Sequence, residues 1–160
     1  STKNSYPLNH VLLKSNEEGK PIYGDLLVTT GEIKVKSLRL DDYLLENSIE
    51  QVDLLKLDLQ GSELPALIGA SNSLSEGKIK CILCEIMFQP HYESQPSVSA
   101  ILWELIEKHD FNLFNLYQHN YHHGYLCQSD VLLFHSSIDS DIREKAHLLF
   151  HSHSKISVSS

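Results

Sequence analysis

The sequence predicts an α/β fold in which the first strands run parallel and the last two form an antiparallel pair. Two apolar runs, residues 52–59 and 79–86, have the length and content of buried strands. A helical pattern follows each run, and a crossover through a helix makes successive strands parallel. Two later alternating segments, residues 112–117 and 130–134, have no helix between them, so they can pair as a hairpin at one edge of the sheet.

The composition is that of one globular domain. The chain has 160 residues, enough to bury a core, of which 41% are hydrophobic and 21% are charged. Its formal net charge of −8 comes without a basic stripe, which argues against nucleic acid as a partner because an acidic surface repels phosphate. No run reaches the roughly 20 apolar residues that span a bilayer, and residues 1–5 show no secretory signal. We therefore expect a cytoplasmic protein that does not bind membranes.

The three cysteines are interpreted as small buried side chains. Cys81 and Cys84 form a C-x-x-C pattern, which can indicate a zinc or redox site. They lie within a predicted strand, however, where positions three apart point to opposite faces and cannot share a metal. Cys127 has no cysteine near it in the sequence. This use of cysteine suits a reducing cytoplasm.

The first part of the chain gives weaker signals. Residues 8–13 predict a short helix or strand, and residues 16–21 predict a loop. Alternation of apolar and polar residues over 33–38 predicts a strand. Asp41 and Asp42 follow it and are interpreted as turn or N-cap residues before a short helix, rather than as metal ligands.

Capping signals set the limits of the next two helices. Ser62 is a suitable N-cap, and Glu63 beside it is favoured by the helix dipole. This predicts a helix that ends near Gly69. A second, shorter helix is expected at residues 72–77.

The clearest helix of the sequence begins at Pro96 and ends near His109. Beyond it, residues 119–124 predict a loop between the two strands of the hairpin. Residues 139–150 predict a last helix, and the Ser-rich residues 151–160 a frayed end. The helix that begins at Pro96 is predicted because apolar residues with helical spacing form one face of it; they are Val98, Ile101, Leu102, Leu105 and Ile106.

Polar side chains interrupt the apolar strand at residues 52–59. Lys56, Asp58 and Gln60 alternate with leucines and therefore point to the same side. Burying an ammonium group and a carboxylate is costly unless they are paired or reach water. Ligands of open α/β sheets bind beyond the carboxyl ends of the strands, so these side chains predict a site there. Glu85 ends the next strand at the same edge.

Several motifs resemble, in order and spacing, those of the FkbM-type S-adenosylmethionine-dependent methyltransferase family. They run from residue 33 to residue 135 and comprise Leu40-Asp41-Asp42, Lys56-Leu57-Asp58-Leu59-Gln60-Gly61-Ser62-Glu63, Leu67-Ile68-Gly69-Ala70, Glu85, Tyr92 with Gln95-Pro96, and Ser129-Asp130-Val131-Leu132-Leu133-Phe134. The resemblance implies a Rossmann-like class I methyltransferase sheet that is incomplete at its N-terminal side. Residues 1–136 would be the C-terminal part of a methyltransferase domain, and residues 137–160 a helix and a flexible tail.

The same resemblance implies transfer of a methyl group from S-adenosylmethionine to a hydroxyl of a small molecule or sugar. Such a hydroxyl must lose its proton, and Asp58 is the first candidate base, with Lys56 holding it ionised. Asp58 and Gln60 are also expected to contact the cofactor. Glu85 is the alternative base, or a residue of the acceptor pocket. The side chains expected to contact the acceptor are Tyr92 and Gln95.

The glycines depart from the family pattern. Members of the family hold the cofactor with a glycine-rich turn after their first strand, whereas the seven glycines of this chain include no G-x-G. The main cofactor loop is therefore expected upstream, which would make the chain part of a longer enzyme. The rival hypothesis is a truncated, non-catalytic α/β module that assembles with a partner. The acceptor, the oligomeric state and any metal dependence stay open.

Each candidate residue also has a purely structural explanation. Lys56 and Asp58 can form an ion pair that only stabilises the edge of the sheet. Glu85 can simply reach solvent at the end of its strand, and Tyr92 can cover the core.

Other kinds of site find little support in the sequence. His147 and His151 are four apart, but no glutamate stands where an H-E-x-x-H motif requires it. The chain has no G-x-S-x-G, which argues against a serine hydrolase with a nucleophile elbow. The clustered histidines are interpreted as solvated side chains; they are His119, His122, His123, His147, His151 and His153.

Overall fold

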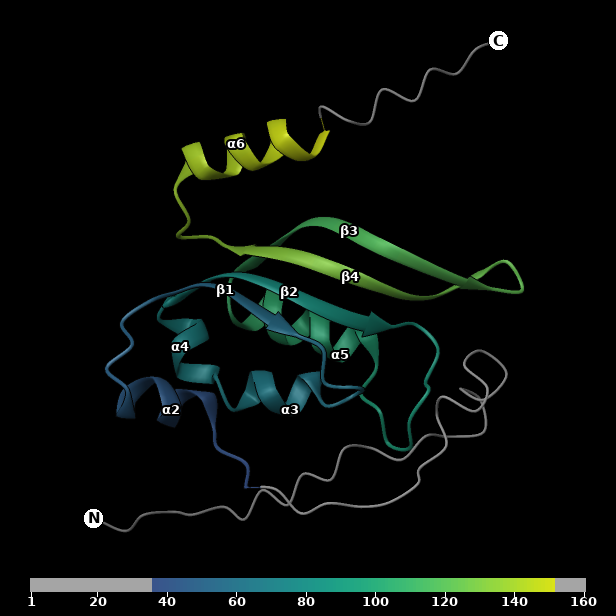
Figure 1. Ribbon diagram of the computed structural model, residues 1–160, viewed down its shortest axis with the longest axis horizontal. Helices are drawn as coiled ribbons and strands as arrows, with labels where there is room; N and C mark the ends of the chain where they lie inside the picture. Colours follow the sequence, from purple (N-terminus) through teal and green to yellow (C-terminus); the bar gives the residue numbers. More distant parts are fainter. Residues whose placement is uncertain (1–35, 152–160) are drawn as a thin grey trace.

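The computed structural model describes residues 36–151, which form a four-stranded sheet with helices packed against it (Figure 1). The predictions for residues 8–13 and 16–21 lie outside this range, as does most of the frayed end. Of the strand predicted at residues 33–38, only residues 36–38 are described, and they do not belong to a strand. Leu38 is 54% exposed, so its apolar side chain does not mark a face packed on the core.

The sheet contains β1 (Val52–Leu57), β2 (Ile79–Met87), β3 (Phe111–His122) and β4 (Tyr125–His135), in the order β1-β2-β4-β3. β1 and β2 pair parallel, whereas β4 pairs antiparallel with both β2 and β3. The expected α/β class, the parallel crossover and the C-terminal antiparallel pair are thus confirmed. The last strand of the chain in the sheet lies between β2 and β3.

Strand β1 differs from its prediction as a strand buried on both faces. It lies at one edge of the described sheet, and within it only Leu57 is buried. Leu54 is 54% exposed. The reason is that α3, α4 and α5 lie against one face of the sheet (Figure 1). An apolar run resembles a fully buried strand, but the sequence of the run does not reveal how many faces are covered.

The helices follow the predicted order. They are α2 (Leu40–Glu46), α3 (Glu63–Ile68), α4 (Ser71–Ser75), α5 (Val98–Leu102), which continues as the π-helix η2 (Trp103–Lys108), and α6 (Ser140–His151). Ser62 occupies the N-cap position of α3, although its side chain makes no capping hydrogen bond. Ser97 caps α5, because its Oγ accepts from the Ala100 N–H at 3.2 Å.

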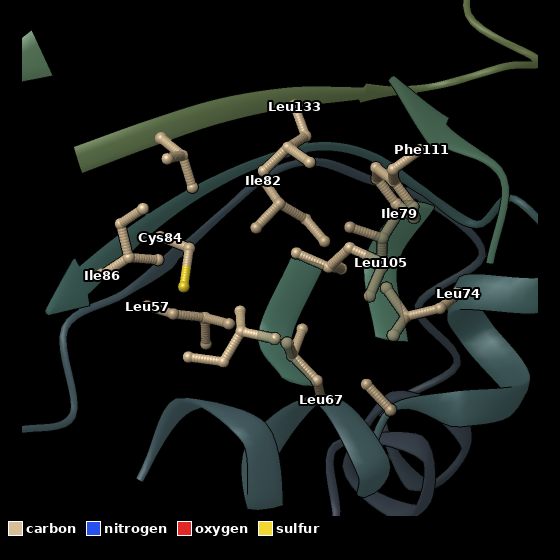
Figure 2. Packing of buried hydrophobic residues seen from close by; sticks show 13 residues of the cluster. Leu57, Leu67, Leu74, Ile79, Ile82, Cys84, Ile86, Leu105, Phe111 and Leu133 are labelled. Atoms are coloured by element: carbon tan, nitrogen blue, oxygen red, sulfur yellow. The ribbon is translucent and has the colours of Figure 1, made fainter. Parts of the chain in front are cut away.

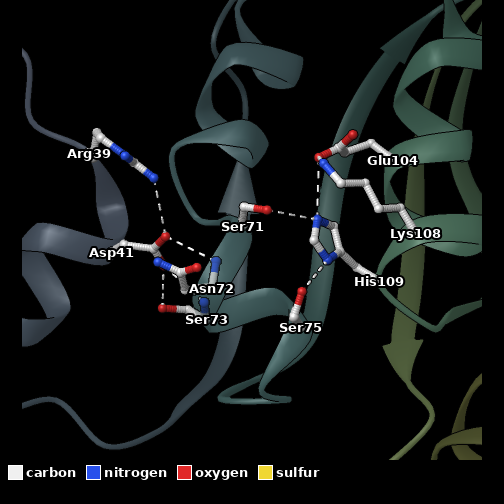
Figure 3. A network of polar contacts seen from close by, with 9 residues as sticks. All are labelled: Arg39, Asp41, Ser71, Asn72, Ser73, Ser75, Glu104, Lys108 and His109. Carbon is white, nitrogen blue, oxygen red and sulfur yellow. Dashed lines mark hydrogen bonds and ion pairs between the residues drawn. The ribbon is translucent and has the colours of Figure 1, made fainter. Parts of the chain in front are cut away.

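Asp41 does not lie in a turn before α2 but in the first turn of the helix, and its carboxylate caps a different helix. Its Oδ1 accepts from the Ser73 N–H at 2.9 Å and from the Ser73 hydroxyl at 2.7 Å, and its Oδ2 accepts from the Asn72 N–H at 3.0 Å (Figure 3). Arg39 lies 3.5 Å from the same carboxylate. Asp41 therefore fixes the start of α4 against α2.

A second polar network joins α4 to the end of η2 (Figure 3). His109 is 2% exposed, with Nδ1 2.9 Å from Ser75 Oγ and Nε2 3.3 Å from Glu104 Oε1. Lys108 binds the same Glu104 oxygen at 2.7 Å. The buried imidazole and carboxylate are thus both hydrogen-bonded, as burial of polar groups requires.

The hairpin is longer than predicted. Residues 119–124 were expected to form a loop, but β3 runs to His122 and β4 starts at Tyr125. The turn needs only His123 and Gly124, which both adopt positive φ (+49° and +81°), as a two-residue hairpin turn requires. The loop prediction was wrong because the tyrosines and histidines flanking the glycine can extend the strands.

The core lies between the sheet and helices α3 to η2 (Figure 2). Removing this apolar surface from water is the main term that holds the layers together. No helix within residues 36–151 has the length and apolar character needed to cross a bilayer. The core cluster comprises Leu57, Leu67, Ala70, Leu74, Ile79, Ile82, Cys84, Ile86, Ile101, Leu105, Phe111, Val131 and Leu133.

Candidate active site

A chain of polar contacts starts at the carboxyl end of β1. Lys56 Nζ lies 3.0 Å from Asp58 Oδ2, and Gln60 Nε2 donates to Asp58 Oδ1 at 3.0 Å. Gln60 Oε1 in turn accepts from the Tyr92 hydroxyl. The structure therefore brings together four residues that the sequence singled out, and links the end of β1 to the loop after β2.

Asp58 is ionised in this arrangement. Hydrogen bonds from Lys56 and Gln60 hold the pKa of Asp58 below its ordinary value, with Lys56 as the largest cause, although partial burial acts in the opposite direction. The Lys56 and Asp58 side chains are 55% and 42% exposed, so the pair is open to solvent. Such an exposed pair adds little to stability. It leaves a fixed carboxylate within reach of a ligand.

Left-handed backbone shapes the turn between β1 and α3. Gln60 has φ +53° and Gly61 has φ +93°. Glycine adopts such values without cost, but a side chain of the size of glutamine does so only when its surroundings hold it there. Gln60 thus combines a strained backbone with a side-chain amide that hydrogen-bonds to both Asp58 and Tyr92. This combination marks the turn as a candidate functional element.

Glu63 supports that turn and was missed as a site residue. It is 3% exposed, and its Oε1 accepts from the Leu59 N–H at 2.8 Å and from the Gly61 N–H at 3.3 Å. The sequence pattern places Glu63 at the start of a helix and at the end of a family motif, without a role in the site. Its spacing of two residues from a glycine turn was the available signal.

Glu85 lies near the end of β2, on the side of the sheet away from the core residues Cys84 and Ile86. Its Oε1 accepts from Gln128 Nε2, whereas its Oε2 is buried and has no hydrogen-bond partner among the described residues. Burial is the largest cause that raises the pKa of Glu85, from an ordinary 4.5 to about 7. The neighbouring negative charges of Asp58, Glu63 and Asp130 raise it further.

Gln128 and Asp130 join the site through strand pairing. In the register of β2 against β4, Asp130 lies opposite Glu85 and Gln128 lies opposite Met87. The sequence pattern places Asp130 in a family motif but does not assign it to the site. A register between strands more than 40 residues apart leaves no local signal in the sequence.

Gln95 braces the loop after β2, where its backbone N–H donates to the Tyr92 carbonyl at 3.4 Å. Its Oε1 accepts from the His91 N–H at 3.0 Å. It also lines a pocket of about 350 Å³ that opens beside the end of β2. Tyr92, at 8% exposure, is mostly buried with its hydroxyl on Gln60. The other residues that line the pocket are Met87, Phe88, Pro90, Pro96, Ser97, Val98 and Ser99.

The expectation of three buried cysteines holds for two of them. Cys84 and Cys127 are fully buried, but Cys81 is partly exposed because it lies on the face of β2 that helices α3 to α5 do not cover. Burial raises the pKa of the Cys81 thiol to about 11, so it stays protonated at neutral pH. Within the described part of the chain, no group of three or more His, Cys, Asp or Glu side chains is placed to hold a metal ion.

Comparison with known proteins defines the class. The model of the methyltransferase FkbM domain matches residues 3–121, most of the chain, and the chain therefore belongs to the FkbM methyltransferase family. The match begins well before residue 33, where the recognisable motifs start.

One curated relative supports the assignment. A "2-O-methyltransferase NoeI" of Sinorhizobium fredii (strain NBRC 101917 / NGR234) is 38% identical over 72 residues, which is 45% of this chain. The aligned part is 29% of that relative, so the chain spans well under two thirds of it. No solved structure matches the chain.

Proposed function

We propose that this chain carries the acceptor side of the active site of an S-adenosylmethionine-dependent O-methyltransferase. The observation that carries the proposal is the pair of unlike carboxylates at one edge of the sheet. Glu85 has a pKa of about 7, whereas Asp58 has a pKa below its ordinary value. Two nearby carboxylates with pKa values pushed apart are typical of sites that divide proton transfer from charge stabilisation.

The fold supports this function. Parallel strands β1 and β2 are followed by an antiparallel hairpin, an order that resembles the second half of a Rossmann-like methyltransferase sheet. On this proposal, residues 1–136 are the C-terminal part of a methyltransferase domain. Residues 137–160 are an appended helix and tail.

Glu85, rather than Asp58, is the proposed general base. A base works best when its pKa lies near the operating pH, which the half-buried Glu85 carboxylate satisfies. Asp58 holds a proton too weakly for this task, because Lys56 and Gln60 both donate to it. The sequence alone ranked the two in the reverse order, since it does not reveal how deeply each carboxylate is buried.

Asp58 is proposed to act through its fixed negative charge. S-adenosylmethionine, when bound, supplies the methyl group from a sulfonium cation. The side chains present fit such a cation, since the carboxylates Asp58, Glu85 and Asp130 outnumber the single ammonium of Lys56 on this part of the sheet. Asp58 and Gln60 are the residues proposed to hold the cofactor at this end.

The acceptor is proposed to be a small molecule or sugar that presents a hydroxyl to Glu85. The name of the NoeI relative, a 2-O-methyltransferase, supports an oxygen acceptor. The pocket beside β2 is lined by apolar side chains and by serine and glutamine side chains, and so offers both stacking and hydrogen-bonding surface. Gln95 lines this pocket, and Tyr92 lies in the same loop, between the lining residues Pro90 and Gln95 in the sequence.

Methyl transfer from labelled S-adenosylmethionine, measured on the protein encoded by the complete reading frame, tests the proposal. Replacing Glu85 by Gln keeps the shape and removes the base, so we expect kcat to fall by about 10²–10⁴-fold. The matched control is Glu107→Gln, at an exposed position on η2, with unchanged kcat. Equal activity of the Glu85 and Glu107 variants would reject Glu85 as the base. Absence of transfer in every form would favour the non-catalytic module.

A further inference from the structure

A buried carboxylate to which the proposed reaction assigns no step lies against the turn that carries Gln60. Glu63 begins α3 and is 3% exposed. Its Oε1 accepts the backbone N–H groups of Leu59 and Gly61, which flank Gln60 on both sides. Hydrogen bonds to a charged acceptor are stronger than bonds between neutral groups.

We propose that Glu63 is a positioning residue, which holds the turn between β1 and α3 in the one conformation that presents Gln60 to both Asp58 and Tyr92. The consequence for catalysis rests on the proposed methyltransferase function. The consequence for the conformation of the turn does not, so the two can be tested apart.

The turn needs such support because its own bonds are few. Gln60 and Gly61 both adopt left-handed backbone, at φ +53° and +93°. Closure between backbone groups depends on the Ser62 N–H, which donates to the Leu59 carbonyl at 3.2 Å. The Ser62 side chain adds no capping bond. Without Glu63, the glutamine would be free to leave the left-handed region for its preferred one.

The position of Gln60 matters because its amide group connects two parts of the site. Its Nε2 donates to Asp58 Oδ1 at 3.0 Å, and its Oε1 accepts from the Tyr92 hydroxyl. A rotation of the turn would break both contacts together. It would remove the link that Gln60 makes between the end of β1 and the loop after β2.

The charge of Glu63 has a separate effect, on Glu85. Glu63 is one of the negative groups that raise the pKa of Glu85, after burial and Asp58. A neutral side chain of the same length should therefore lower this pKa while still accepting the two N–H bonds. The charged and polar groups around Glu85 are Lys56 and Asp58 at β1, Glu63 on α3, and Gln128 and Asp130 on β4.

Two conservative variants of the full chain separate the effect of the length of the Glu63 side chain from the effect of its charge. Glu63→Asp keeps the charge but is one methylene shorter, so it cannot reach both N–H groups. Glu63→Gln keeps the length and loses the charge. The control is Glu107→Asp, at an exposed position on η2. Amide hydrogen exchange of Leu59 and Gly61 and the ¹³C titration of Glu85 are followed by NMR, neither of which requires activity.

We expect Glu63→Asp to speed exchange of the Leu59 and Gly61 amides by about three- to tenfold, the range for losing a modest hydrogen bond. It should also shift the NMR signals of the Gln60 side-chain amide. Glu63→Gln should speed exchange less than Glu63→Asp does, because its amide oxygen still reaches both N–H groups as a weaker, neutral acceptor, and it should lower the pKa of Glu85. In an active enzyme, Glu63→Asp should reduce kcat through the misplaced Gln60, by up to about 10²-fold.

Wild-type exchange of both amides in Glu63→Asp, with unshifted Gln60 signals, would overturn the proposal. So would equal acceleration in Glu63→Asp and in the Glu107→Asp control. If Glu63→Asp does not fold, Glu63→Gln decides, because exchange of both amides at the wild-type rate in a variant that weakens both bonds would also contradict the role of this side chain. Absence of methyl transfer together with the expected exchange pattern would reject the function and keep the positioning role.

Discussion

Glu85 and Asp130 lie directly opposite each other on the antiparallel strands β2 and β4. Side chains at such paired positions stand close together on one face of the sheet. Both are carboxylates, and the charge of Asp130 contributes to the raised pKa of Glu85. The pairing of two distant strands thus tunes the residue that we propose as the base.

Replacing Asp130 by Asn should lower the pKa of Glu85, because it removes a negative charge beside the carboxylate. The ¹³C chemical shift of the Glu85 carboxyl, followed against pH, measures the change. Asp42→Asn, at an exposed position on α2, removes the same charge far from the site and should leave the titration unchanged. An unchanged titration in Asp130→Asn would show that the two carboxylates do not interact.

The raised pKa of Glu85 also predicts a pH dependence of stability. Between the ordinary pKa of 4.5 and the folded-state value of about 7, the folded protein binds more protons than the unfolded chain. The contribution of Glu85 is therefore fully present below the lower value and is lost as the pH rises through the upper one.

Glu85→Gln removes this contribution. The free energy of unfolding of the variant, relative to wild type, should thus improve between about pH 5 and pH 8, by on the order of 1 kcal/mol after allowance for solvent screening. Urea denaturation at both pH values measures the difference. A constant difference between the two proteins would indicate that Glu85 titrates normally.

The edge position of β1 predicts unequal effects of two leucines in the same strand. Leu57 is 5% exposed and lies in the core, whereas Leu54 is 54% exposed. Leu57→Ala should lower the free energy of unfolding by about 2–5 kcal/mol, and Leu54→Ala by no more than about 0.5 kcal/mol. Chemical denaturation of both variants provides the comparison. Similar losses would mean that the outer face of β1 is covered as well.

The capping role of Asp41 predicts a loss of stability without any effect on the site. Asp41→Ala removes the acceptor for the N–H groups of Asn72 and Ser73 at the start of α4 and should cost about 1–2 kcal/mol. Asp42→Ala, the neighbouring exposed aspartate, should cost no more than about 0.5 kcal/mol. Thermal unfolding distinguishes the two, and equal shifts of the midpoint would argue against the cap.

Local patterns in the sequence were sufficient for the elements whose signal is contained within them. The apolar run of β2 and the helical face from Val98 to Ile106 appear in the structure with small shifts of their ends, whereas the two alternating strands of the hairpin appear but extend through most of the predicted loop. The face shared by Lys56, Asp58 and Gln60 was also predictable, because side chains alternate along a strand.

Features that depend on distant parts of the chain could not be predicted in this way. The exposure of Leu54 depends on which faces of β1 are covered, and the pairing of Glu85 with Asp130 depends on a strand register. Glu85 is preferred to Asp58 as the base because burial and neighbouring charges shift the pKa values of the two carboxylates in opposite directions. Neither burial nor these neighbours can be read from the sequence. The support that Glu63 gives to Gln60 depends on a turn conformation that a sequence motif alone does not specify.

The pKa of Glu85 in the wild-type protein tests the central claim most directly. We predict that its carboxyl carbon titrates with a midpoint near 7, as expected for a half-buried base beside several negative charges. A midpoint near the ordinary 4.5 would contradict the account, because Glu85 would then be a solvated carboxylate with no advantage as a proton acceptor.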